Sequence, residues 1–283
     1  MTLHTPAPDA AEDWTALLRP LDRRFAGYVF DLDGTLYLGD ALLPGAAGTV
    51  RSIRAFGARV AFVTNKPLER PAAYAAKLSG LGIPVAADEV VSSTDALVLY
   101  LCHHAAGARV LTVAEPPLDE ILHEAGFILT REPEDANVVV VAWDRTFDYE
   151  KLVRAFRAVR AGARLVATNA DPWCPMPGGD LPDCAAMLAA IEASAGVTAE
   201  AVVGKPSPHM AKTILERLAL APADAILVGD RLLTDVPMAA TAGMASALVL
   251  TGATRPQDLR LALDAASVRP RYVIPSVADL LPV

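Results

Sequence analysis

Short apolar runs alternate with helix-like stretches along the whole chain, and this alternation limits the folds that it can adopt. The predicted strands are Tyr28–Phe30, Val60–Val63, Val110–Val113, Val138–Ala142, Leu165–Ala167, Ala201–Val203, Ile226–Val228, Ala247–Leu250 and Tyr272–Ile274. Helices are predicted between them at Pro71–Gly80, Tyr149–Ala161, Ala185–Ala195 and Pro208–Leu218. The runs are continuously apolar, as strands buried on both faces are. The pattern therefore predicts an α/β fold with a mostly parallel sheet.

The composition excludes several classes of protein. Hydrophobic residues make up 53% and charged residues 20% of the chain, which excludes a disordered polymer. No apolar run approaches the roughly 18 residues of a membrane span, and the start of the chain does not resemble a signal peptide. The sparse cysteines predict a reduced, cytoplasmic setting. Because the net charge is −8, nucleic acid is not expected as a partner, and because no apolar run is long enough, a membrane is not expected either.

Polar clusters follow several of the predicted strands at their carboxyl ends. They are Asp31-Leu32-Asp33-Gly34-Thr35, Thr64-Asn65-Lys66, Gly204-Lys205-Pro206-Ser207-Pro208 and Gly229-Asp230-Arg231, with Asp235 shortly after the last. In open parallel sheets, ligands bind beyond the carboxyl ends of the strands. We therefore expect these clusters to converge on one edge of the sheet if their strands are neighbours.

The residue types in these clusters indicate a particular chemistry. Converging carboxylates repel one another at low dielectric, and a hard divalent cation such as Mg²⁺ relieves that repulsion. Thr64 and Asn65 offer hydrogen-bond donors, and Lys205 offers a point charge for a phosphoryl oxygen. Carboxylates, a metal ion and a lysine together suit phosphoryl transfer, in which a carboxylate can also be the nucleophile.

Each cluster alone has a simpler structural explanation. Asp and Gly after a strand are common turn formers, Thr64-Asn65 could cap a helix, and the lysine segment could be a helix entry. The order of all the clusters, each after an apolar run, is hard to explain by turns. Other motifs fail on inspection, because Pro206 replaces the Ser or Thr of a P-loop, and Cys174 and Cys184 lack the spacing of a zinc site.

With these clusters in this order, the chain resembles the haloacid dehalogenase-like (HAD) superfamily. DLDGTL at Asp31–Leu36 is similar to its first motif, and Thr64-Asn65, Lys205 and Gly229–Asp235 resemble the second, third and fourth. More narrowly, the chain resembles the NagD-like, p-nitrophenyl phosphatase-like subfamily. The stretches that carry this resemblance are Phe62–Asn65, Ala167–Pro175 and Val203–Pro208.

The resemblance implies roles for the first-motif carboxylates. Asp31 would attack phosphorus and also bind Mg²⁺. Asp33 would protonate the leaving oxygen and then activate water, and its backbone carbonyl would bind the metal.

The resemblance also implies roles for the other clusters. Thr64 and Asn65 would hold phosphate oxygens, and Lys205 would neutralise the nucleophile and the phosphate. Asp230 would be a direct metal ligand, and Asp235 would lie on the metal side of the site, either bound directly or orienting metal-bound water.

The fold that the resemblance implies is a Rossmann-like parallel-sheet core with an inserted α/β cap domain of the C2 type. About 140 residues separate Asn65 from Lys205, far too many for a loop. We therefore expect core residues at 1–84, a cap at 85–198 and core residues again at 199–283. Family members often form a homodimer. A short amphipathic helix is also predicted over Asp9–Arg19, with Asp9 as its N-cap.

Two features depart from the family pattern. Lys66 stands where relatives often have Asn or a small residue, and we expect it to face solvent. The cap stretch Pro172–Cys184 carries Asp180 and Asp183. If the cap closes over the substrate, these carboxylates would help to set specificity and would disfavour a substrate with a second anionic group.

These expectations combine into one predicted activity with two alternatives. The chain is predicted to be a Mg²⁺-dependent phosphatase that hydrolyses a small phosphorylated metabolite through an aspartyl-phosphate. A phosphotransferase or phosphomutase would use the same residues. A non-catalytic phospho-ligand binding protein is the second alternative, and the presence of both Asp31 and Asp33 argues against it.

Overall fold

The computed structural model describes residues 14–174 and 179–282, and its larger sheet has six parallel strands in the order β15–β14–β13–β1–β4–β5. These strands are β1 (Gly27–Asp31), β4 (Arg59–Thr64), β5 (Val90–Ser92), β13 (Ala225–Gly229), β14 (Ala245–Val249) and β15 (Tyr272–Ile274). All of them except β5 coincide with predicted strands, which confirms the parallel sheet.

The middle of the chain forms a second parallel sheet, in the order β12–β9–β8–β6–β7. Its strands are β6 (Arg109–Val113), β7 (Ile128–Leu129), β8 (Val138–Val141), β9 (Arg164–Ala167) and β12 (Ala201–Val202). Two antiparallel hairpins complete the strands: β2 (Tyr37–Leu38) with β3 (Ala41–Leu42), and β10 (Trp173–Cys174) with β11 (Leu181–Pro182). The α/β class and the parallel core are therefore confirmed.

Helices cover both faces of the six-stranded sheet because side chains along each strand point alternately to the two sides. Tyr28 and Phe30 pack with α1 (Ala46–Ala55) and α2 (Pro71–Gly80). Val29, between them, packs on the opposite side. The helices on that side are α3 (Ser93–His104), α7 (Pro208–Leu218) and α8 (Asp235–Ala242).

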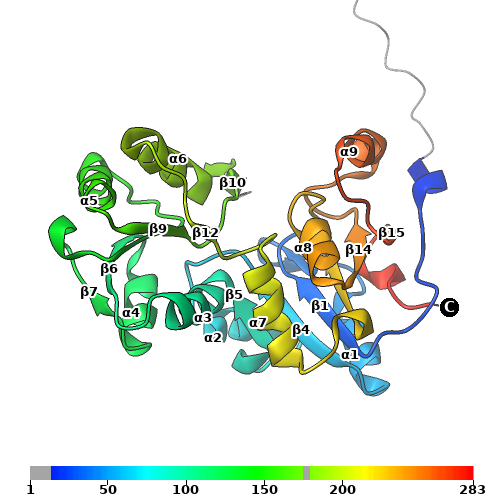
Figure 1. Ribbon diagram of the computed structural model, residues 1–283. Coiled ribbons are helices and arrows are strands. Elements are labelled where there is room, and N and C mark those ends of the chain that lie inside the picture. Colours follow the sequence, from blue (N-terminus) through cyan, green and yellow to red (C-terminus); the bar gives the residue numbers. More distant parts are fainter. Residues whose placement is uncertain (1–13, 175–178, 283) are drawn as a thin grey trace, which may run out of the picture.

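The second sheet is covered in the same way. Helices α5 (Tyr149–Arg160) and α6 (Cys184–Ala195) lie on one face, and α4 (Pro116–Glu124) lies on the other (Figure 1). Helix α3 packs against both sheets, because Leu97 and Leu101 belong to one apolar cluster with Val29 and Val110. The two sheets are therefore joined by continuous packing.

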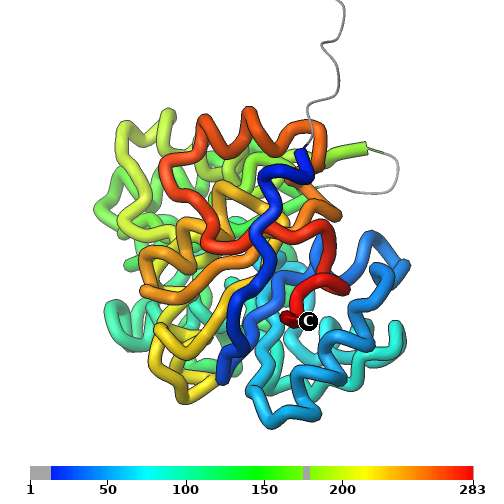
Figure 2. Tube along the Cα trace, turned by 90° about the vertical axis from the view of Figure 1, so that its right-hand side faces the viewer, coloured from blue at the N-terminus to red at the C-terminus, as the bar shows by residue number. Residues whose placement is uncertain are grey.

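The first segment of the described chain passes beside the last strand, β15, as Figure 2 shows. The Arg19 N–H donates to the Val273 carbonyl (2.8 Å), and the Val273 N–H donates back to Arg19 (3.0 Å). Helix α9 (Leu259–Ala265) packs with Leu17 in the same region. The predicted N-cap Asp9 lies outside the described residues. Short 3₁₀ helices are η1 (Trp14–Leu17), η2 (Ala87–Glu89), η3 (Pro133–Asp135), η4 (Pro222–Asp224), η5 (Pro256–Asp258) and η6 (Val277–Asp279).

The chain changes from one sheet to the other at places that differ from the predicted boundaries. Strand β5 lies after residue 84 but pairs with β4 of the six-stranded sheet. Strand β12 lies after residue 198 but pairs with β9 of the second sheet. Each sheet thus includes one short strand from beyond the expected boundary. The chain therefore does not change sheets at the boundaries of the expected segments 1–84, 85–198 and 199–283. Among the described residues, no helix has the length and hydrophobicity needed to span a bilayer.

Candidate active site

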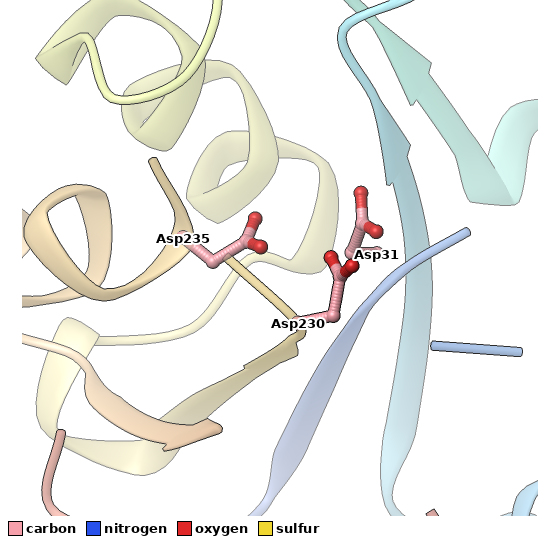
Figure 3. Close-up of side chains that lie close together, drawn as sticks. All are labelled: Asp31, Asp230 and Asp235. Atoms are coloured by element: carbon pink, nitrogen blue, oxygen red, sulfur yellow. The ribbon is translucent and has the colours of Figure 1, made fainter. Parts of the chain in front are cut away.

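Three carboxylates meet at the carboxyl edge of the six-stranded sheet. Asp31 ends β1, Asp230 follows the neighbouring β13, and Asp235 is the first residue of α8. Carboxylate oxygens of the three lie within 4.8 Å of one another. Figure 3 shows the three side chains turned toward a common point. All three are buried, with Asp230 only 2% exposed. The expected convergence is therefore confirmed for these residues.

Glycines make room for this cluster. A Cβ on Gly252 would lie 2.0 Å from Asp230 Oδ2, and one on Gly34 would lie 2.4 Å from the same atom. Gly34 also has a φ of +81°, which disfavours other residues. A Cβ on Gly229 would lie 2.3 Å from the Asp235 carboxylate. These glycines are needed for close approach of the backbone to buried carboxylates.

Lys205 supplies a buried cation to the cluster. Its ammonium group donates to Asp31 Oδ1 and to Asp235 Oδ1, the latter over 2.8 Å. The lysine lies just before α7, which Ser207 caps and Pro208 begins. Burial alone would lower the pKa of Lys205, but the Asp235 and Asp31 carboxylates raise it above its ordinary value. The lysine is therefore held in its charged form.

The Lys205 ammonium group and the nearby Arg231 guanidinium group do not fully balance the three buried carboxylates. Burial raises the pKa of Asp31 to about 8, an effect that Lys205 opposes and that Asp235 and Asp230 reinforce. Burial, together with the nearby Asp235, likewise raises the pKa of Asp230 to about 6. The metal-free cluster thus carries more negative charge than its surroundings stabilise.

The residues present fit a hard divalent cation. Asp230 Oδ1 is buried and has no hydrogen-bond partner among the described residues, whereas Asp230 Oδ2 accepts from the Ala253 N–H. Such an orphaned oxygen within an all-oxygen donor set is what Mg²⁺ would bind. Both oxygens of Asp235 already accept hydrogen bonds, from Lys205 and from the Arg231 N–H. Asp31 Oδ1 also accepts from Lys205, but within the described chain its Oδ2 has only a long hydrogen bond, from the Thr35 hydroxyl over 3.5 Å. Asp31 and Asp230 are therefore the best-placed direct ligands.

This electrostatic imbalance predicts how stability depends on pH. Because the folded-state pKa values of Asp31 and Asp230 are raised, the folded protein holds protons that the unfolded chain releases. The metal-free protein should lose stability as pH rises from about the ordinary carboxyl value of 3.8 to about 8. Mg²⁺ should raise the melting temperature more at pH 8 than at pH 5. Thermal unfolding in EDTA and in Mg²⁺ tests this, and an equal metal effect at both pH values would contradict it.

Asp33 lies apart from the three-carboxylate cluster and has its own partners. Its Oδ1 is 2.9 Å from the Lys66 ammonium group, and its Oδ2 accepts from Tyr37 Oη over 3.3 Å. The expectation that Lys66 faces solvent is therefore wrong, since its side chain is only 23% exposed. The reason is that Asp33 lies within reach and attracts it. The two first-motif carboxylates thus have different environments.

Thr64 ends β4 beside β1, and Asn65 follows it directly, as expected. Thr64 is buried, and its Oγ1 accepts from the Lys66 N–H over 3.1 Å. The Asn65 side chain is fully engaged, because its Oδ1 accepts from the Lys205 N–H (2.7 Å) and its Nδ2 donates to Asp171 and to the Lys205 carbonyl. A phosphate contact from Asn65 would have to come from its main chain.

The second sheet closes one side of the cavity over this edge. Its lining residues from that side are Asp171, Trp173, Cys174 and Asp183. Asp183 is buried as the N-cap of α6, accepts from Asn169 Nδ2 over 3.1 Å, and has its pKa raised by burial to about 6. Asp180 is exposed and does not line the cavity. The intervening residues 175–178 of the predicted specificity stretch lie outside the described residues.

Asp171, Arg231 and Thr234 line the cavity but were given no role from the sequence. Asp171 follows β9 and lies 3.8 Å from the guanidinium group of Arg231, which in turn lies 5.5 Å from the centre of the Trp173 ring. The polar run after β9 could have indicated Asp171, because it too follows the carboxyl end of a strand. Arg231 belongs to the segment Gly229–Asp235, in which roles were assigned from the sequence only to Asp230 and Asp235.

Comparison with known proteins identifies the family that this site resembles. Residues 28–128 match the family model described as haloacid dehalogenase-like hydrolase, and residues 202–280 match the one described as HAD-hydrolase-like. The chain is 34% identical over 255 residues to the sugar-phosphatase AraL of Bacillus subtilis, covering 90% of this chain and 92% of that protein.

Solved structures are similar over nearly the whole chain. The 4-nitrophenylphosphatase of Thermotoga maritima superposes with a TM-score of 0.84 at 33% identity, covering 90% of this chain and 96% of that one. NagD from E. coli K-12 superposes with a TM-score of 0.81 at 29% identity, covering 90% and 98%. The similarity therefore extends over both sheets.

Proposed function

Because the chain belongs to the haloacid dehalogenase-like hydrolase family, and within it to the NagD-like phosphatases, we propose that it hydrolyses phosphomonoesters through an aspartyl-phosphate on Asp31. It is a phosphatase of small phosphorylated substrates. The proposal adds the covalent intermediate, the metal ion and the role of each residue. Mg²⁺ bound by Asp31 and Asp230 would neutralise charge on the phosphoryl group and orient it.

The first step of the proposed reaction transfers the phosphoryl group to the protein. An Asp31 oxygen attacks phosphorus, and the bond from phosphorus to the leaving oxygen breaks while Asp33 donates its proton to that oxygen. Lys205 already contacts Asp31, so it would stabilise the charge that gathers on the phosphoryl oxygens. Thr64 would donate a hydrogen bond to the same group.

The second step releases phosphate. Asp33, now a carboxylate, takes a proton from water as the water oxygen attacks phosphorus. The bond between phosphorus and Asp31 breaks, which regenerates the Asp31 carboxylate, leaves Asp33 protonated for the next turnover and frees inorganic phosphate. The observation that carries this proposal is that the two carboxylates have separate partners. Asp31 pairs with Lys205 in the buried cluster, whereas Asp33 pairs with Lys66 and accepts a hydrogen bond from Tyr37. One group is thus placed as nucleophile and the other as acid and base.

Metal removal tests the proposal directly. Hydrolysis of p-nitrophenyl phosphate should stop in EDTA and return when Mg²⁺ is added in excess. With an acceptor sugar present, phosphate should still be released to water, because a phosphotransferase would instead produce the phosphorylated acceptor. Full activity after exhaustive chelation would contradict the metal role.

Lys66 gives a second prediction. Lys66→Met should lower kcat by about 10- to 100-fold, because it removes a hydrogen bond to a charged group worth about 1.5–3 kcal/mol. Lys212→Met on the exposed face of α7 is the matched control and should leave kcat unchanged. Steady-state kinetics of both variants provide the measurement, and equal rates in the two would show that Lys66 does not support Asp33.

The part of the chain around the second sheet is proposed to act as the cap over this site. The observation that supports it is the cavity, which is lined from both sheets. We expected Asp180 and Asp183 to disfavour a substrate with a second anionic group. Of these two residues only Asp183 lines the cavity, so the expectation now applies to Asp183 alone. Comparing kcat/KM for 2-phosphoglycolate and for a neutral-alcohol phosphate tests it, and equal efficiency would contradict it.

A further inference from the structure

Asp171 of the second sheet contacts the phosphate-binding side of the six-stranded sheet. It follows β9 and is 8% exposed. Its Oδ2 accepts from Asn65 Nδ2 over 2.7 Å and from Asn169 Nδ2 over 3.0 Å. A buried carboxylate with such partners holds them in place, because their donors would otherwise be left unpaired.

Asn65 links Asp171 to Lys205 through hydrogen bonds. Its side chain brackets the lysine backbone, accepting from the Lys205 N–H over 2.7 Å and donating to the Lys205 carbonyl over 3.1 Å. The Asn65 carbonyl is itself fixed by the Ser93 hydroxyl over 2.7 Å. The amide can donate one hydrogen to Asp171 and the other to the Lys205 carbonyl in only one orientation, so Asp171 reinforces the orientation that binds the Lys205 backbone.

The backbone before Lys205 is also held by the second sheet. The Val203 N–H donates to Ala167 (3.0 Å), and the Gly204 N–H donates to the Thr168 carbonyl (2.7 Å), which continues the pairing of β12 with β9. A Cβ on Gly204 would lie 2.4 Å from that carbonyl oxygen, so the approach requires glycine. Lys205 therefore enters the site directly from a strand of the second sheet.

We infer that Asp171 is a positioning residue, which holds Asn65 and through it sets the place of the Lys205 ammonium group. This inference rests on the proposed function, in which Lys205 binds the phosphoryl group. The segment Thr168–Asp171 would then position residues that bind the phosphoryl group, in addition to lining the side of the cavity that receives the leaving group. The effect of Asp171 should therefore be independent of the leaving group.

Asp171→Ala tests this inference with two substrates of different leaving group, p-nitrophenyl phosphate and glycerol phosphate. We expect kcat/KM to fall about 10- to 100-fold for both, by the same factor, as loss of a buried hydrogen-bond acceptor implies. The dissociation constant of inorganic phosphate, measured by calorimetry with Mg²⁺, should rise in parallel. Glu134→Ala, which removes an exposed carboxylate of the same sheet region, should change neither quantity.

Three results would overturn the inference. They are wild-type kinetics in Asp171→Ala, losses that differ between the two substrates by more than tenfold, and unchanged phosphate binding. Lys205→Met shows whether the inference about Asp171 or the proposed function has failed. Full activity in Lys205→Met would contradict the proposed role of Lys205, independently of the results for Asp171. When Lys205 is already replaced, Asp171→Ala should cost little further activity.

A pair of variants keeps the test decisive if Asp171→Ala does not fold. Asp171→Asn keeps the shape of the side chain and an oxygen that can accept from Asn65 and Asn169. It should keep kcat/KM and phosphate binding within about threefold of the wild type, whereas Asp171→Leu, which has a similar size but no acceptor, should lose at least about tenfold of both. Equal values in the two folded variants would contradict the link between these residues.

Discussion

Asp31→Asn should leave the fold intact and lower kcat for p-nitrophenyl phosphate by about 10⁴-fold or more, as removal of a nucleophile does. An amide of the same size cannot form the covalent intermediate. It also removes one charge from the buried cluster, in which burial raises the pKa of Asp31 to about 8. The metal-free variant should therefore melt at a higher temperature than the wild type at pH 8.

The matched control is Asp40→Asn, the same change at a fully exposed carboxylate near in sequence. It should change neither kcat nor the melting temperature appreciably. If Asp31→Asn keeps activity within tenfold of the wild type, Asp31 is not the nucleophile. If it melts at a lower temperature than the wild type in EDTA at pH 8, the account of the cluster's charge is wrong.

Lys205→Met should lower kcat/KM by about 10³-fold, the upper range for loss of one preorganised donor to a reacting group. It should also destabilise the metal-free protein by about 3–5 kcal/mol, because it leaves buried carboxylates without their cation. Asp31 and Asp235 both contact the ammonium group that this change removes. Chemical denaturation in EDTA and steady-state kinetics with Mg²⁺ measure the two effects.

Mg²⁺ should recover part of the stability lost in Lys205→Met, because it supplies positive charge to the same carboxylates. It should not recover the activity. Lys212→Met, at an exposed lysine of α7, serves as the control for both measurements. Unchanged stability of Lys205→Met in EDTA would show that the lysine does not balance the cluster.

Most strands of the two large sheets were predictable because each is a short apolar run that is largely buried. Strands β5 and β7 were missed, since Val90–Ser92 and Ile128–Leu129 are too short to stand out from the neighbouring segments. Helices α2 and α7 begin at a proline and end at the predicted residues. The sheet to which β5 and β12 belong could not be read from the sequence, because strand pairing is a long-range property.

The carboxylate cluster was predictable for a related reason. Polar residues at the carboxyl ends of adjacent parallel strands meet at one edge, and Asp31 and Asp230 follow that rule. The partners of Asn65 and Asp33 did not follow from any local pattern. Asp171 lies 106 residues from Asn65 in sequence, and only the packing of the two sheets brings it within hydrogen-bond distance. The sequence around Lys66 does not show whether its side chain forms a salt bridge or faces solvent.

The covalent intermediate is the central claim, and mass spectrometry of Asp33→Asn tests it most directly. This variant keeps the nucleophile and, with the good leaving group of p-nitrophenyl phosphate, should still be phosphorylated, but it lacks the base for the second step. After rapid quenching, the protein should carry one additional phosphoryl group, and peptide mapping should locate it on Asp31. A phosphoryl group on another residue, or turnover with no phosphorylated protein at any time, would contradict the account.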